Sequence, residues 1–92
     1  MNMTKEKFNP SDNVQDVEEG QRELILHNDE VNTFDFVIES LIDVCDHDPH
    51  QAEQCATIAH MKGKCGVKIG SEDELKPPYN EMLNRKLTVS IN

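Results

Sequence analysis

The residues Leu24–Cys45 read LILHNDEVNTFDFVIESLIDVC and contain two hydrophobic patterns separated by a polar segment. The first is a run of three branched aliphatic residues, Leu24–Leu26, which predicts a short strand. Residues 27–33 follow and are polar except for Val31. Beyond them, apolar residues recur every three or four positions, as on one face of an amphipathic helix, at Phe34, Val37, Ile38, Leu41, Ile42 and Cys45. We therefore predict a strand, a loop and a helix, with Asn32 or Thr33 as the helix cap.

A second helix and two more strands are predicted on the C-terminal side of this stretch. Asp48 followed by Pro49 is a typical helix start, and Gly63 is a typical helix end. Two later segments alternate apolar and polar residues, which predicts strands with one face on a core. Their apolar positions are Cys65, Val67 and Ile69 in the first segment, and Leu87, Val89 and Ile91 in the second.

A third helix is predicted between these two strands. Ser71 can cap it, because three acidic residues follow that suit the positive end of a helix. Pro77–Pro78 should kink this helix or split it in two, since proline has no backbone N–H to donate. The predicted order is strand, helix, helix, strand, helix, strand. This order indicates an α+β fold, in which helices pack on one face of a small three-stranded antiparallel sheet.

The charge of the chain excludes several classes of partner. Its 18 Asp and Glu residues against 9 Lys and Arg give a formal charge of −9, and no Lys or Arg occurs between Glu23 and Met61. Nucleic acids and anionic membranes bind basic surfaces, so neither is expected as a partner. No apolar run approaches the roughly 20 residues that span a bilayer. We expect a cytoplasmic protein whose three cysteines, an odd number, are reduced thiols.

The N-terminal residues differ in composition from the rest of the chain. Residues 1–20 contain only two branched aliphatic side chains, Val14 and Val17, and end in an acidic cluster. Such a segment buries too little apolar surface to offset the entropy lost on ordering. We therefore predict a flexible acidic tail over residues 1–20 and one folded domain over residues 21–92.

Several short motifs, taken in order, resemble the ClpS family of adaptors, which bind N-terminal degradation signals for a Clp-type AAA+ protease. The motifs are Leu24–Glu30, Phe34–Val37, Gln51–Ala52, His60-x-x-Gly63 and Cys65–Val67. The resemblance runs from about Arg22 to the C-terminus. Each motif is weak alone, but the ordered set is fairly specific. It implies an adaptor rather than an enzyme, without a cofactor or metal.

The resemblance also implies which residues bind a substrate. In the family, an Asn-Asp pair and a histidine hold the free α-amino group, which places Asn28, Asp29 and His60 in those roles here. An α-ammonium has three donors and one positive charge, so an amide oxygen, a carboxylate and an unprotonated imidazole nitrogen suit it. Binding should weaken in mildly acidic solution, because a doubly protonated His60 cannot accept a hydrogen bond.

The family also has an apolar pocket for a bulky first side chain. By resemblance, its walls here are Phe34, Val37, Ala56, Ala59 and Leu87. An apolar stripe is as often part of the core, so for each of the five both interpretations stay open. Phe34 stands where family members often have Met, and the segment between Gly63 and Cys65 is short, so the preferred first residue is open.

The resemblance further implies contact with the unfoldase through the start of the third helix, residues Glu72–Lys76, and engagement of the N-terminal tail during delivery. An acidic first turn is, however, also a common helix feature. Zinc binding is the alternative function, since Cys45-x-His47-x-x-His50, Cys55 and Cys65 contain suitable ligand types. No C-x-x-C pair supports it, and no nucleophile motif indicates an enzyme.

Overall fold

The computed structural model describes residues 20–92, which form one three-stranded antiparallel sheet and three helices. In chain order the elements are β1 (Gln21–His27), α1 (Phe34–Cys45), α2 (Pro49–Lys62), β2 (Lys64–Ser71), α3 (Glu72–Asn84) and β3 (Val89–Ile91). β1 is the central strand, with β2 and β3 antiparallel to it on either side. The predicted α+β fold and the order of its elements are confirmed. The predicted tail lies outside the described residues except for Gly20.

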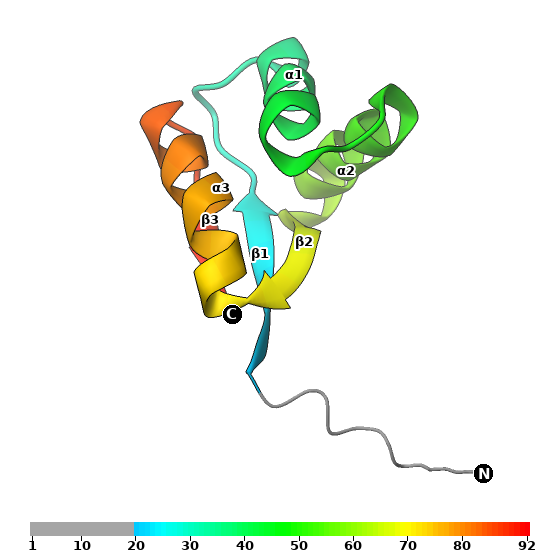
Figure 1. Ribbon diagram of the computed structural model, residues 1–92. Coiled ribbons are helices and arrows are strands. Elements are labelled where there is room, and N and C mark those ends of the chain that lie inside the picture. Colours follow the sequence, from blue (N-terminus) through cyan, green and yellow to red (C-terminus); the bar gives the residue numbers. More distant parts are fainter. Residues whose placement is uncertain (1–19) are drawn as a thin grey trace, which may run out of the picture.

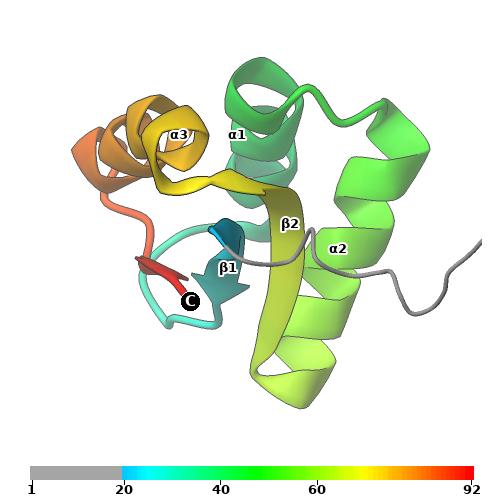
Figure 2. The same ribbon diagram turned by 60° about the horizontal axis from the view of Figure 1, so that its bottom comes forward.

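The helices pack on one face of the sheet. α2 runs beside β2, α3 packs on β1 and β3, and α1 lies between these two helices (Figures 1 and 2). The core between the layers contains fully buried side chains from the central strand and from two helices: Leu24, Leu41, Leu75 and Met82. No helix within residues 20–92 combines the length and the apolar composition that crossing a bilayer requires.

Predicted capping residues begin α1 and α2, and a predicted glycine ends α2. The Thr33 hydroxyl, rather than Asn32, accepts from the backbone N–H of Phe36 at 3.1 Å and begins α1. The Asp48 carboxylate begins α2 by accepting from the N–H of Gln51 at 2.8 Å. Gly63 ends α2 with a φ of 98°, a left-handed conformation that glycine adopts without a Cβ penalty. This turn places the end of α2 beside the end of β1.

The two prolines do not divide α3. A capping box begins the helix: the Ser71 hydroxyl accepts from the N–H of Glu74 at 3.1 Å, and the Glu74 carboxylate accepts from the N–H of Ser71 at 2.8 Å. The helix then runs through Pro77 and Pro78 to Asn84. Leu75 and Met82 are fully buried on either side of the prolines, so tertiary packing holds the helix in one piece although proline removes backbone hydrogen bonds.

One part of the predicted alternation in β2 is wrong. Leu24 pairs with Lys68 and Ile25 with Gly66, so Val67 is an extra residue in a β-bulge. A bulge of one residue exchanges the two faces of the strand beyond it. Ile69, predicted to share the core face with Val67, is therefore 62% exposed.

Candidate functional site

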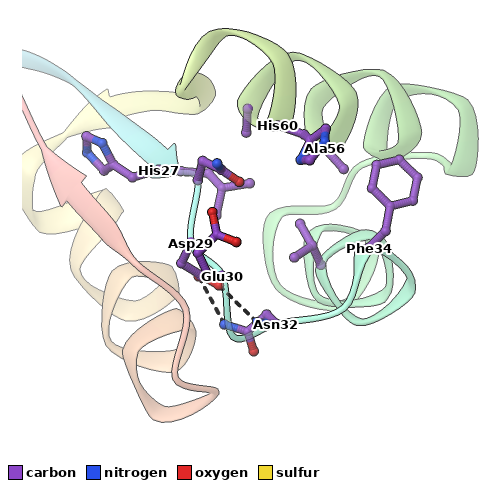
Figure 3. A pocket seen from close by; sticks show the side chains of 11 residues that line it. His27, Asp29, Glu30, Asn32, Phe34, Ala56 and His60 are labelled. Carbon is purple, nitrogen blue, oxygen red and sulfur yellow. Dashed lines mark hydrogen bonds between the residues drawn. The ribbon is translucent and has the colours of Figure 1, made fainter.

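A cavity of about 430 Å³ lies between the end of β1, the start of α1 and the second half of α2. Its volume is within the range of roughly 300–1,000 Å³ that is typical of small-ligand pockets. Polar side chains from the loop after β1 face apolar side chains from the two helices (Figure 3). The lining residues are Leu26, His27, Asn28, Asp29, Glu30, Asn32, Phe34, Val37, Ala56, Ala59 and His60.

Backbone hydrogen bonds bring the polar loop against α2. The N–H of Asn28 donates to the carbonyl of Gly63 at 2.9 Å, and Gly63 in turn donates to the carbonyl of Ala59, one turn back in the helix. His60 lies in that last turn of α2 and is exposed. Asn28, Asp29 and His60, which are far apart in sequence, therefore line the same cavity.

The loop is folded around the carboxylate of Asp29. Its Oδ1 accepts from the backbone N–H groups of Val31 and Asn32, both at 2.9 Å. Its Oδ2 accepts from the side-chain amide of Asn32 at 3.0 Å and, more weakly, from the hydroxyl of Thr88 at 3.4 Å. An ionised carboxylate has about four acceptor sites, so these four donors occupy most of its capacity. Asp29 therefore determines the shape of the loop.

Asp29 is also a fixed negative charge at the cavity. Partial burial would raise its pKa, but hydrogen bonds from Asn32, Val31 and Thr88 outweigh that effect and lower the pKa below its ordinary value. Neither Asp29 nor the neighbouring Glu30 takes part in an ion pair within residues 20–92. The cavity thus has negative charge at its polar end that a cation can neutralise.

Asn32 is a residue of this site that the sequence indicated only as a possible helix cap. Its side-chain amide donates to Asp29 Oδ2 and, at 2.9 Å, to the carbonyl of Lys86. Lys86 has a φ of 69° in the connection between α3 and β3. Asn32 thus ties the loop to a distant segment. Local sequence could indicate the turn around Asp29, but not this long-range contact.

The apolar wall comes from α1 and α2. Phe34 and Val37 contribute from α1, and Ala56 and Ala59 from α2. Phe34 is 44% exposed, and Figure 3 shows it across the cavity from Asp29. The two alanines are buried, and their small side chains leave the floor of the cavity open.

Leu87 does not line the cavity. It is 3% exposed and belongs to the hydrophobic core. Of the two interpretations left open by the sequence, the core position is the one found for Leu87. The other four predicted pocket residues lie together in the cavity wall.

Comparison with known proteins identifies the family. Residues 18–89 match the family model described as ATP-dependent Clp protease adaptor protein ClpS. The chain belongs to the ClpS family. A solved structure, Agrobacterium tumefaciens ClpS2 bound to L-phenylalaninamide, resembles it with a TM-score of 0.73 and 19% identity, over 79% of this chain and 95% of that one. No protein with a curated description matches the chain.

The residues considered for zinc do not assemble in this ClpS family member. Within residues 20–92, no three His, Cys, Asp or Glu side chains come together in a way that could hold a metal ion. The His47 ring is buried, and its Nε2 lies 2.8 Å from the carbonyl oxygen of Val67. Because a carbonyl only accepts, Nε2 carries the proton and donates to it. Cys45 is buried in the core, where desolvation raises its pKa to about 11.

Proposed function

We propose that this ClpS family protein is an N-degron adaptor. It binds the free α-amino group and the bulky apolar first side chain of a substrate, and delivers that substrate to a Clp-type AAA+ unfoldase in the cytoplasm. One observation carries this proposal: a single cavity has a negatively charged, acceptor-rich loop on one side and an apolar wall on the other. An N-terminal residue with a bulky side chain has the matching pair of features.

The polar side of the cavity suits an ammonium group. The side-chain oxygen of Asn28 and an unprotonated nitrogen of His60 are acceptors that can bind N–H groups directly. We assign Asp29 a different role in binding the amine. Because four donors already surround its carboxylate, it acts through its negative charge and by holding the loop in shape. Glu30 adds a second negative charge to the same side.

The apolar side suits a large first side chain such as that of Phe or Leu. Ala56 and Ala59 leave space at the floor, and the exposed part of Phe34 offers an aromatic contact at the wall. The structurally similar ClpS2 was solved with L-phenylalaninamide. We expect the same ligand, which has a free amine and a benzyl side chain, to bind this cavity.

The test uses fluorescently labelled peptides that differ only in their first residue. Peptides beginning with Leu, Phe, Tyr or Trp should bind, and the N-acetylated form of each should not, because acetylation removes the charge and two donors. A matched peptide beginning with Ser should bind weakly, since it cannot fill the apolar part. Equal binding of free and acetylated Phe peptides would refute the assignment of the polar loop.

Delivery is assigned to the start of α3 and to the N-terminal residues 1–20. Within residues 72–76 every side chain is exposed except Leu75, which is buried, and Glu74 is engaged in the capping box. The variant E72K/D73K should keep peptide affinity and lose transfer of a degron-tagged substrate to a Clp unfoldase. The control E53K changes an exposed charge on α2 and should transfer normally.

A truncated chain that lacks residues 1–20 gives a separate test of the tail. It should bind peptide and fail in delivery. Normal transfer by both altered chains would remove these two regions from the delivery surface and leave the peptide site unaffected.

A further inference from the structure

Two cysteine thiols on neighbouring elements lie unusually close together. Cys55 is on α2 and Cys65 is on β2, the neighbouring strand (Figure 2). Their Sγ atoms are 2.7 Å apart. This distance exceeds the S–S bond length by only about 0.7 Å, so a covalent bond requires little movement of the two elements. Neither thiol has a part in the proposed peptide site.

The two thiols differ in access to solvent. Cys65 is partly exposed, whereas Cys55 is 4% exposed and donates its S–H to Cys65 Sγ. Burial, the hydrogen bond to Cys65 and the proximity of that group all raise the pKa of Cys55. Cys65 is therefore the thiol that an oxidant can reach, and the buried Cys55 contacts the sulfur of Cys65 from the side of the protein interior.

We propose that Cys55 and Cys65 form a reversible dithiol–disulfide site that reacts with low-molecular-weight disulfides such as oxidised glutathione. The Cys65 thiolate attacks one sulfur of the glutathione disulfide, which forms a mixed disulfide and releases one glutathione thiolate. Cys55 Sγ then attacks Cys65 Sγ, releases the second glutathione thiolate and gives up its proton to it or to water. The protein loses two electrons and two protons, and one glutathione disulfide becomes two thiols.

The bond joins two elements that contribute to the cavity. Cys65 pairs with Leu26 of β1, and Cys55 precedes Ala56 of α2; both Leu26 and Ala56 line the cavity. The disulfide therefore fixes α2 to the sheet. It also closes the short chain segment from residue 55 to residue 65, which should raise the melting temperature on the order of 10 °C.

The test measures the intact mass of the full chain after incubation with oxidised glutathione, without a reducing agent. The protein should lose two hydrogen atoms and regain them with dithiothreitol. In the C45S variant, trypsin should release residues 23–62 joined to residues 65–68, because the first peptide then contains only Cys55. This map uses a variant in which both proposed partners are intact.

Single variants separate the two roles. C55S should keep one glutathione on Cys65, because the resolving thiol is missing, and C65S should remain unmodified. A lasting glutathione adduct on the wild type, unreacted thiols, or a bond to Cys45 would overturn the proposal. A disulfide form that melts below the reduced form would also overturn it, because the bond would then require local unfolding.

Discussion

The substitution Asp29→Asn tests both tasks assigned to this residue, because it keeps the size of the side chain and removes the charge. The amide oxygen can still accept from the backbone N–H groups of Val31 and Asn32. The amide nitrogen replaces Oδ2 and faces the side-chain N–H of Asn32, so that hydrogen bond is lost. The Thr88 hydroxyl can turn and accept from the amide nitrogen instead.

The expected magnitudes follow from these contacts. A hydrogen bond to a charged group contributes about 1.5–3 kcal/mol, and partial exposure favours a smaller value, so the free energy of unfolding should fall by about 1–2 kcal/mol. The bond from Thr88, at 3.4 Å, adds little. Two unit charges 4 Å apart attract by about 1 kcal/mol in water and about 4 kcal/mol near a protein surface. The affinity for a free N-terminus should thus fall about ten- to hundredfold.

Urea unfolding followed by circular dichroism measures the first effect, and fluorescence anisotropy with a Phe-initiated peptide measures the second. Thr88→Ala is the control, since it removes only the weakest bond, and it should change the stability by less than about 0.5 kcal/mol. If D29N is folded and binds the peptide within twofold of wild type, the charge has no part in amine recognition. If it is as stable as wild type, the loop does not depend on the carboxylate.

Three further predictions concern the cavity, the core and pH. Ala56→Leu should fill the cavity, lower the affinity for Phe peptides at least tenfold and reduce the free energy of unfolding by less than about 1.5 kcal/mol. The control Ala52→Leu, in the closed core, should reduce the free energy of unfolding by more, as measured in urea. Leu87→Ala should destabilise by about 2–5 kcal/mol without reordering the preference among first residues, which a peptide panel would show. Because its hydrogen bonds lower the pKa of Asp29, the stability that this carboxylate contributes should be fully present above its ordinary value of 3.8 and be lost as the pH falls below it, which urea unfolding of wild type and D29N at several pH values would show.

The fold could be predicted where local signals agree with tertiary packing. Thr33, Asp48 and Gly63 act within one helical turn of their own positions, so their roles are visible in sequence. The exposure of Ile69 was not predictable, because the bulge at Val67 depends on how β2 pairs with β1. The continuity of α3 through Pro77 likewise depends on tertiary packing rather than on the propensity of its own residues.

The candidate site, like the fold, was predictable only in part. The order of short motifs along the sequence predicted Asn28 and His60 as site residues, and both line one cavity. The bond from Asn32 to the Lys86 carbonyl crosses 54 residues and has no local sequence pattern. Leu87 is an apolar residue that could equally have lined a pocket, and only the structure shows that it lies in the core and not at the cavity. Residue type predicts the chemistry of a site better than it predicts which apolar side chains are left with open space.

Substitutions on the two sides of the cavity should have different effects, because different contacts hold each side in place. Hydrogen bonds from Asn28 to Gly63 and from Asn32 to Lys86 fix the polar loop to two distant segments. We therefore expect the proposed recognition of the amine to depend on the stability of the whole domain. The floor, by contrast, is set by the small side chains of Ala56 and Ala59, of which only Ala59 also belongs to the core cluster, together with Ala52 and Cys55 of the same helix. Substitutions at Ala56 should therefore alter which first residue is accepted at a smaller cost in stability than substitutions at Ala59, whereas substitutions in the loop should weaken binding of all N-termini together.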